Sequence, residues 1–246
     1  MKDEFYRKTY DEGGHKLPQQ IMAAEIRTPS VVVVDHFYND PDEVRNWAIE
    51  QTYDDPETHG AVGYRCERGR KIFDGTREAI ENLMHGKVIE GKEEGQWDYS
   101  TNGCFQWCPA GTPVVFHCDS QQYAGAVYLD PNAPREAGTS LYRHKDTGID
   151  WMPNGPNGNE ECEKYFGEPW PVIHNAVFGK YQDHESNFLD NTLFEKTDEI
   201  ANIYNRLVIW DARKIHSASS YYGDNIHNSR LFHLFFFNLE KEEDNI

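Results

Sequence analysis

The sequence predicts a mainly β fold of the sandwich or jelly-roll type, with supporting helices in its N-terminal part. From residue 99 onward, short β-branched or aromatic stretches alternate with turn residues, a pattern typical of such folds. Hydrophobic residues make up 38% of the 246 residues and aromatic residues 13%, which is enough for a sizeable core. A β-sandwich can use this length as one unit, so we expect a single domain spanning residues 1–246.

The N-terminal part, residues 1–98, is expected to hold one strand and the supporting helices. Residues 30–37 (SVVVVDHF) form a β-branched run that favours a strand. Asp40 and Pro41 then provide an N-cap and a first helical residue, and an apolar stripe follows at Val44, Trp47 and Ala48. A second helix is predicted over residues 76–84. Both helices should pack on a sheet.

The β core is predicted over residues 99–239. Its candidate strands are residues 103–107, 114–119, 125–129, 139–144, 193–200, 206–210 and 230–238. A stretch rich in Gly, Pro and Asn interrupts them at residues 149–190. Long connections inside compact domains are usually functional, so we expect a lid-like, substrate-facing insertion there.

The charge balance restricts the partners and the compartment. With 42 acidic and 24 basic residues, the net charge is −18, which repels nucleic-acid backbones and anionic membrane surfaces. The N-terminus lacks the apolar run of a signal peptide, and no apolar stretch approaches the roughly 20 residues of a membrane span. We therefore expect a soluble, cytoplasmic protein that binds neither nucleic acid nor membranes. Its five cysteines favour ordinary thiols over a disulfide framework or a zinc cluster.

Two residues of a candidate metal site lie in the run His117-Cys118-Asp119. Residues two apart on a strand project to the same face, so the imidazole and the carboxylate can converge on one metal. A third ligand from a distant strand would complete a 2-His-1-carboxylate triad, which leaves positions open on Fe(II). We predict His216, which follows the strand candidate at residues 206–210.

A second motif in the sequence could form the same kind of metal site. His144 and Asp146 form another His-x-Asp motif after another strand, so an isolated motif is weak evidence.

Arg230 enters the aromatic strand RLFHLFFFN, where a buried charge needs a partner. The guanidinium fork suits the far carboxylate of a bound dicarboxylate. Alternatively, the head group reaches solvent or a local acid such as Asp224.

The runs HCD, AVYLD, AGTSLYRHKDTG, NRLVIWDARKIHS and RLFHLFFF resemble the core of the Fe(II)/2-oxoglutarate-dependent dioxygenase superfamily. Within it, the chain resembles the prolyl-hydroxylase-like branch and its small uncharacterised bacterial and viral relatives. The earlier run VVVVDHFYNDPDEVRNWA is similar to the entry strand and helix of those relatives, so the resemblance extends over residues 30–239. It implies a double-stranded β-helix, that is, a cupin-like jelly roll.

The resemblance also implies roles for individual residues. It places iron on His117, Asp119 and His216, and the C5 carboxylate of 2-oxoglutarate on Arg230. Tyr128 would donate a hydroxyl hydrogen bond to that carboxylate. Trp107 stands where this branch often has a tyrosine in the cosubstrate pocket, and the resemblance implies that Gln106 shares the contact with the cosubstrate. The implied cofactors are Fe(II) and 2-oxoglutarate, with ascorbate as a supporting reductant.

The implied reaction is hydroxylation of an unactivated C–H bond by dioxygen, with release of succinate and CO2. Asp119 supports hydroxylation, because halogenating relatives replace this carboxylate with a small residue. The substrate is a small molecule or a peptide, for instance a prolyl residue or an amino-acid-like compound, and the oligomeric state is left open. The alternatives are a non-catalytic cupin-like module that binds a metal or a sugar, and a cupin isomerase or thiol dioxygenase.

Overall fold

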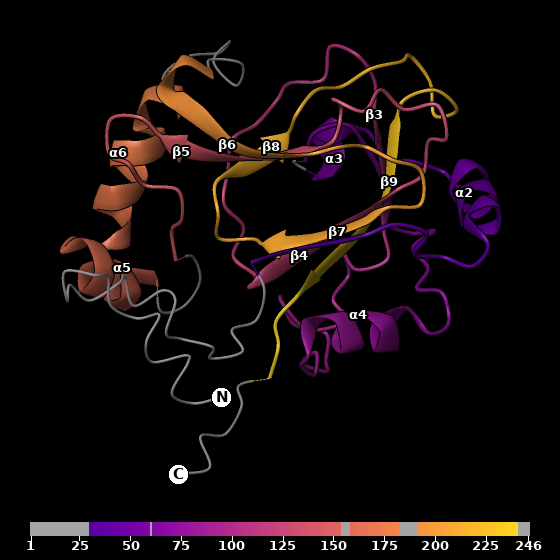
Figure 1. Ribbon diagram of the computed structural model, residues 1–246, viewed down its shortest axis with the longest axis horizontal. Coiled ribbons are helices and arrows are strands. Elements are labelled where there is room, and N and C mark those ends of the chain that lie inside the picture. The colour runs from indigo at the N-terminus through magenta and orange to yellow at the C-terminus, as the bar shows by residue number, and fades with distance from the viewer. Residues whose placement is uncertain (1–29, 60, 154–157, 183–190, 241–246) are drawn as a thin grey trace, which may run out of the picture.

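The computed structural model describes residues 30–59, 61–153, 158–182 and 191–240, and these form two antiparallel sheets with helices on their outer faces (Figure 1). The first 29 residues lie outside the described residues, as do residues 154–157 and 183–190 of the predicted insertion. The larger sheet has the order β1-β7-β4-β9-β3-β2, with bounds Val31–Val34, Leu207–Asp211, Tyr123–Tyr128, Arg230–Phe237, Phe105–Cys108 and Tyr64–Cys66. The smaller sheet has the order β6-β5-β8, with bounds Phe194–Ile200, Thr139–His144 and His216–Ala218.

Helices precede the β core and also interrupt it. Those before the core are α2 (Pro41–Ile49), α3 (Pro56–His59) and α4 (Thr76–Met84), and those within it are α5 (Gly158–Phe166), α6 (Trp170–Gln182) and a 3-10 turn (Asn191–Leu193). The predicted start of α2 is confirmed, because the Asp40 side chain accepts a 2.9 Å hydrogen bond from the Glu43 amide and a proline follows the cap. No helix in the described part of the chain is both long and apolar enough to cross a bilayer.

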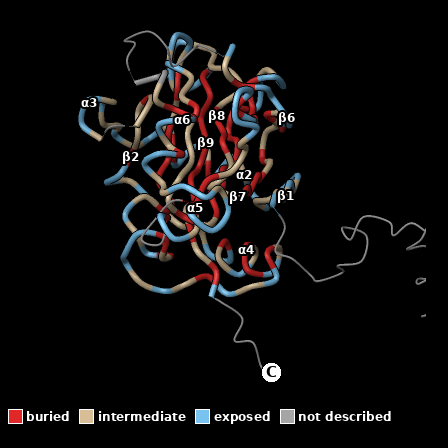
Figure 2. Tube along the Cα trace, turned by 90° about the vertical axis from the view of Figure 1, so that its left-hand side faces the viewer, coloured by how far each residue is buried: buried red, intermediate tan, exposed pale blue. Residues whose placement is uncertain are grey.

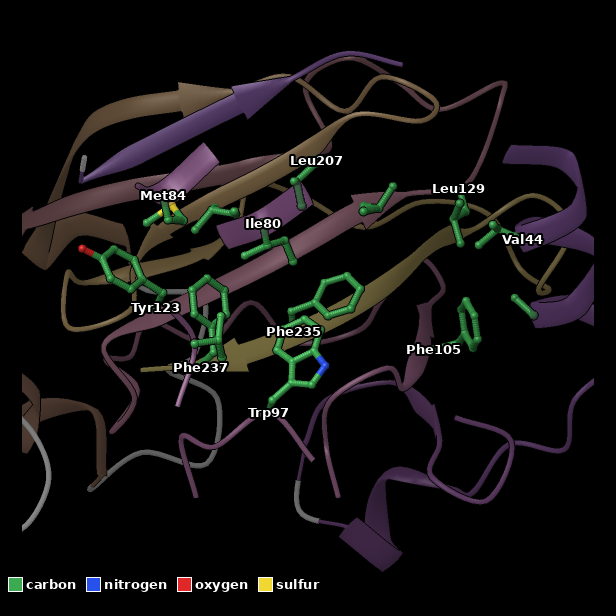
Figure 3. Packing of buried hydrophobic residues seen from close by; sticks show 14 of the residues in the cluster. Val44, Ile80, Met84, Trp97, Phe105, Tyr123, Leu129, Leu207, Phe235 and Phe237 are labelled. Carbon is green, nitrogen blue, oxygen red and sulfur yellow. The ribbon is translucent and has the colours of Figure 1, made fainter. Parts of the chain in front are cut away.

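The outer face of the large sheet packs against α2 and α4 (Figure 3). These helices contribute Val44 and Ala48, and Ile80 and Met84. The sheet contributes every second residue of its strands, among them Leu231, Phe235 and Phe237 of β9. Trp97 stacks on Phe235 at 5.9 Å. The helices α2 and α4 therefore pack on the outer face of the large sheet, as predicted, whereas β1 is an edge strand of that sheet.

The inner face of the large sheet meets the small sheet across a second apolar layer. This layer takes Tyr128 from β4, Trp210 from β7 and Phe232 from β9, together with Leu141 and Ile200 of the small sheet. The central strands appear almost wholly buried in Figure 2, because both of their faces are covered. Arg230, Phe232, Leu234 and Phe236 alternate with the outward-facing residues of β9, so they share this inner face.

The structure differs from the predicted elements in several places, and it adds α3 and β2, which the sequence did not predict. Residues 114–119 do not form a continuous strand, because only His117 makes a β-bridge, and its partner belongs to β8, which the sequence did not predict. The insertion contains α5 and α6 rather than an extended loop. Cys162, Ile173 and Val177 of these helices pack with Tyr142 and Phe194 on the outer face of the small sheet. Hydrophobic contacts thus stabilise helices in a stretch whose Gly and Pro content indicates turns.

Replacing Phe235 with alanine should lower the free energy of unfolding by about 3–5 kcal/mol, the usual cost of truncating a buried aromatic residue. Phe235 is fully buried between Trp97 and the helices. Chemical denaturation monitored by circular dichroism measures the change. Val33→Ala on β1, where the side chain is 44% exposed, is the control and should change the stability by less than about 1 kcal/mol. Equal losses in the two variants would contradict the packing described.

Candidate metal centre

A pair of backbone hydrogen bonds brings the segment containing His117 and Asp119 to β8. The His117 amide donates to the His216 carbonyl at 3.1 Å, and the His216 amide donates to the His117 carbonyl at 2.9 Å. The Asp119 amide donates to the carbonyl of Ala212, just after β7, at 2.8 Å. His216 also pairs with Leu141, whose side chain lies in the layer between the sheets. The three predicted ligands are therefore assembled at that layer.

The side chains of His117, Asp119 and His216 converge, with one potential ligand atom from each lying within 4.8 Å of the others. His117 Nε2 lies 3.6 Å from Asp119 Oδ1, and His216 Nε2 lies 3.3 Å from Asp119 Oδ2. Among the described residues, this is the one group of three or more His, Cys, Asp and Glu side chains with such spacing. His216 is buried, whereas His117 and Asp119 are partly exposed, so the group is open on one side.

Backbone carbonyls fix the orientation of both imidazole rings. His117 Nδ1 lies 3.0 Å from the Val115 carbonyl, and His216 Nδ1 lies 2.8 Å from the Lys214 carbonyl. A carbonyl only accepts hydrogen bonds, so each Nδ1 must carry the proton. In the neutral ring the lone pair is then on Nε2, the atom that faces Asp119. Such a contact to the second ring nitrogen is typical of histidine ligands to metals.

The charges of the group favour metal binding near neutral pH. Desolvation, reinforced by the neighbouring His216, lowers the pKa of His117, so this ring stays neutral. Burial opposes ionisation of Asp119, but His117, His216 and Arg65 outweigh it and hold the pKa of this carboxyl below its ordinary value. The group therefore offers two imidazoles and one carboxylate, which are the donor set of mononuclear non-haem iron sites.

The environment of the Asp119 carboxylate indicates whether the group can hold a cation. Its Oδ2 is buried and has no hydrogen-bond partner within the described ranges. A buried carboxylate oxygen without a donor is costly unless a cation neutralises it. A metal ion between the two Nε2 atoms and this carboxylate would provide that charge, so the residues fit a divalent metal.

Arg230 lies buried at the start of β9, on the inner face of the large sheet. Its Nε donates to the Ala137 carbonyl at 3.2 Å, and one terminal nitrogen donates to the Gly138 carbonyl at 3.3 Å. Its guanidinium lies 4.4 Å from the centre of the Phe232 ring. No carboxylate in the described part of the chain lies within ion-pair distance of it, and Asp224 instead bonds to Asn225 and Asn228. A buried guanidinium held by neutral acceptors alone can still bind an anion.

Tyr128 and Thr139 lie beside Arg230. The Tyr128 hydroxyl is 2.7 Å from Thr139 Oγ1, and Arg230 is 3.4 Å from the same oxygen. The Tyr128 ring centre is 5.4 Å from the Arg230 guanidinium. The structure thus brings together Arg230 and Tyr128, as the sequence predicted.

The two candidates on β3 point to opposite faces. Gln106 pairs with Phe232 and is buried on the inner face, where it hydrogen-bonds Arg65. Trp107 pairs with Leu231 and packs on the outer face, with its ring stacked on Tyr64 at 4.3 Å. Adjacent strand residues must alternate between faces, so Trp107 is not placed near Arg230. The prediction that Trp107 contributes to the cosubstrate pocket is therefore corrected.

Sequence reasoning did not find four inner-face residues. Thr139 begins β5 beside Tyr128, and Arg65 on β2 lies beside Gln106. Tyr221, from the loop before β9, places its ring centre 5.9 Å from the Arg230 guanidinium. Trp210 lies 5.2 Å from the His216 ring and has a buried, unpaired Nε1 among the described residues. Strand alternation from Leu141 and Val208 provides a signal for Thr139 and Trp210, but no sequence signal identifies Arg65 or Tyr221.

The competing motif at His144 has a different environment. His144 is buried on the outer side of β5, with Nδ1 2.9 Å from Thr147 Oγ1 and its ring 5.3 Å from Phe194. It is not part of the three-residue group.

The chain is similar to several solved structures at low sequence identity. The chain is 11% identical to HygX from Streptomyces hygroscopicus, solved with nickel, 2-oxoglutarate and hygromycin B bound; the match covers 85% of this chain and 82% of HygX, with a TM-score of 0.45. A prolyl hydroxylase from Trichoplax adhaerens, in complex with a peptide fragment of hypoxia inducible factor, is 12% identical (85% and 84% covered, TM-score 0.43). A Pseudomonas putida prolyl-4-hydroxylase is 14% identical (87% and 94% covered, TM-score 0.40).

No curated protein sequence matches the chain. The model of a family of unknown function, DUF6445, matches residues 16–229. This match spans most of the sequence, and the chain therefore belongs to the DUF6445 family.

Proposed function

We propose that this protein is an Fe(II)- and 2-oxoglutarate-dependent oxygenase that hydroxylates an unactivated C–H bond. One observation carries the proposal: the inner layer between the sheets holds both a His-His-Asp group and a buried arginine without a carboxylate partner among the described residues. The first suits a metal and the second an anion. A cosubstrate that chelates the metal at one end and bears a carboxylate at the other satisfies both.

His117, Asp119 and His216 would hold the iron. Three protein ligands of this kind would leave room on the metal for small molecules. The carbonyls of Val115 and Lys214 keep the Nε2 lone pair of each ring free to bind the metal. Asp119 stays ionised, so it would neutralise part of the metal charge. When bound, iron and 2-oxoglutarate supply the oxidising power for C–H hydroxylation, with dioxygen consumed and succinate and CO2 released.

Arg230 and Tyr128 would bind the far carboxylate of 2-oxoglutarate. The carbonyls of Ala137 and Gly138 hold the guanidinium in one orientation, so it loses little freedom on binding. Tyr128 and Thr139 offer hydroxyl groups at the same place. Burial excludes water, and charge-assisted hydrogen bonds are stronger where water is excluded. Gln106 lines the same face one strand away.

We further propose that residues 1–246 form one oxygenase domain whose core, residues 99–239, is a double-stranded β-helix. The alternation of strands supports this arrangement, since β4, β7 and β9 lie in one sheet and β5, β6 and β8 in the other. Facing sheets connected in this way bring a ligand pair at His117 and a third ligand on β8 into one layer. An intact carboxylate at Asp119 supports hydroxylation, and we propose an amino-acid-like or prolyl substrate.

Adding 2-oxoglutarate to anaerobic Fe(II)-loaded protein should produce the visible metal-to-ligand charge-transfer band of a chelated cosubstrate. Its absence from fully metallated protein would refute the proposal. His216→Ala removes a metal ligand, so the charge-transfer band should disappear. Loss of a residue that only hydrogen-bonds to a ligand already weakens metal binding by roughly 10- to 100-fold, so Fe(II) binding should fall by at least that factor. His227→Ala is the control, because His227 is exposed in the loop before β9.

Replacing Arg230 with glutamine should raise the dissociation constant for 2-oxoglutarate by 100-fold or more, because loss of one partner from a buried ion pair costs about 3–5 kcal/mol. The charge-transfer band, titrated anaerobically, measures this constant. Pyruvate keeps the chelating end but lacks the far carboxylate, so its affinity should not change. Arg68→Gln, at an exposed position, controls for the lost charge. Unchanged affinity for 2-oxoglutarate in Arg230→Gln would contradict the role of this arginine.

A further inference from the structure

Arg65 is a second guanidinium on the inner face of the large sheet. On β2 it pairs with Gln106 of β3, which pairs with Phe232 of β9. Residues paired in this way across antiparallel strands point to the same face. Phe232 lies under the guanidinium of Arg230 in the layer between the sheets. Arg65 therefore faces the small sheet, which carries His216.

Hydrogen bonds hold Arg65 in place without neutralising it. Its Nε and one terminal nitrogen donate to Gln106 Oε1 at 3.0 and 2.8 Å. Gln106 is itself fixed, since its Nε2 donates to the Val62 carbonyl at 2.5 Å. An arginine has five N–H donors, so this single acceptor leaves others for a ligand. The pair is preorganised in the way a planar carboxylate requires.

Charged groups of both proposed sites act on Arg65 or on its neighbours. Burial lowers the pKa of Arg65, whereas Glu67 and Asp119 are near enough to raise it, and Arg65 in turn lowers the pKa of Asp119. Burial raises the pKa of the Cys108 thiol to about 11, and both Arg230 and Arg65 counteract this rise. Cys108 is thus a neutral group between two cations.

Arg65 also lacks an anionic partner in the described ranges, where no carboxylate lies within 4.0 Å of it. The exposed surface of this acidic protein offers many carboxylates, yet a partly buried cation beside the metal group has only a neutral amide. Two separate cations on one face suit two separate anions. Arg230 is the deeper one, because it is 5% exposed and enclosed by Tyr128, Tyr221 and Phe232.

We infer that Arg65, held by Gln106, binds a carboxylate of the primary substrate and sets it beside the metal group. The inference rests on the proposed function and narrows its substrate to compounds with a free carboxylate, such as free amino acids. An internal residue of a peptide has no such group. A carboxylate also suits the site better than a phosphate dianion, because Asp119 would repel the larger negative charge.

Matched acids and amides test the inference. The panel consists of the free L-amino acids, L-proline included, and their C-terminal amides. Calorimetry measures their binding to the anaerobic protein loaded with Fe(II) and 2-oxoglutarate, and also to the metal-free protein. In the wild type, at least one acid should bind tenfold or more tightly than its amide, because hydrogen bonds between charged groups are worth about that factor. Arg65→Gln should abolish this preference.

Three variants complete the comparison. Arg68→Gln, three residues away and exposed, removes the same charge and should keep the preference. Arg65→Lys keeps the charge without the planar fork and should retain a weaker preference; it also serves if Arg65→Gln fails to fold. Gln106→Leu removes the acceptor that orients Arg65, so it should reduce the binding of the acids more than that of their amides.

Specific results would overturn the inference. Equal binding of all acids and amides by the wild type would do so, as would an acid preference that persists in Arg65→Gln. If the titration of the charge-transfer band showed a higher dissociation constant for 2-oxoglutarate in Arg65→Gln, Arg65 would instead be assigned to binding of the cosubstrate. Failure of the proposed function would give a different result, because the wild type would then show no charge-transfer band with 2-oxoglutarate. The comparison of acids with amides on the metal-free protein would still show whether Arg65 binds a carboxylate.

Discussion

The reciprocal backbone pair between His117 and His216 is the contact on which the site depends. It joins a segment that is otherwise irregular to β8, and through Leu141 to the small sheet. Because two backbone hydrogen bonds fix the pairing, the imidazoles face each other, with ring centres 4.2 Å apart. Asp119 then follows two residues later on the same side, anchored to Ala212. A shift of one residue in this pairing would turn Cys118 toward the metal group in place of both ligands.

The second organising feature is positive charge inside a strongly acidic protein. A net charge of −18 repels anions at long range, yet Arg230 and Arg65 present guanidinium groups between the sheets. At short range and away from water, such groups outweigh the mean field. Backbone carbonyls orient one and an amide side chain orients the other. The proposed cosubstrate and the inferred substrate both carry carboxylates, which these two guanidinium groups would bind.

Helices pack against both sheets. The helices α2 and α4 pack on the outer face of the large sheet, while α5 and α6 pack with Tyr142 and Phe194 at one end of the small sheet (Figure 1). The sequence predicted both helices of the first pair, and for α2 the signals were an N-cap, a proline and an apolar stripe, which are all local. It did not predict the second pair, because Gly and Pro in that stretch indicate turns. Cys162 of α5 and Ile173 and Val177 of α6 instead pack in one apolar cluster with Phe194.

The sequence by itself determined the mainly β class, the helix that begins at Asp40, and the motif in which His117 and Asp119 share one side of an extended segment. It also singled out Arg230, because a charge entering an aromatic strand needs a polar partner, whereas Tyr128 was expected from the family resemblance. The tertiary structure decided which of two His-x-Asp motifs meets a third ligand, which of Gln106 and Trp107 faces inward, and that Arg65 lies beside the group. These depend on strand register, which arises from pairing between segments far apart in the chain and leaves no local pattern.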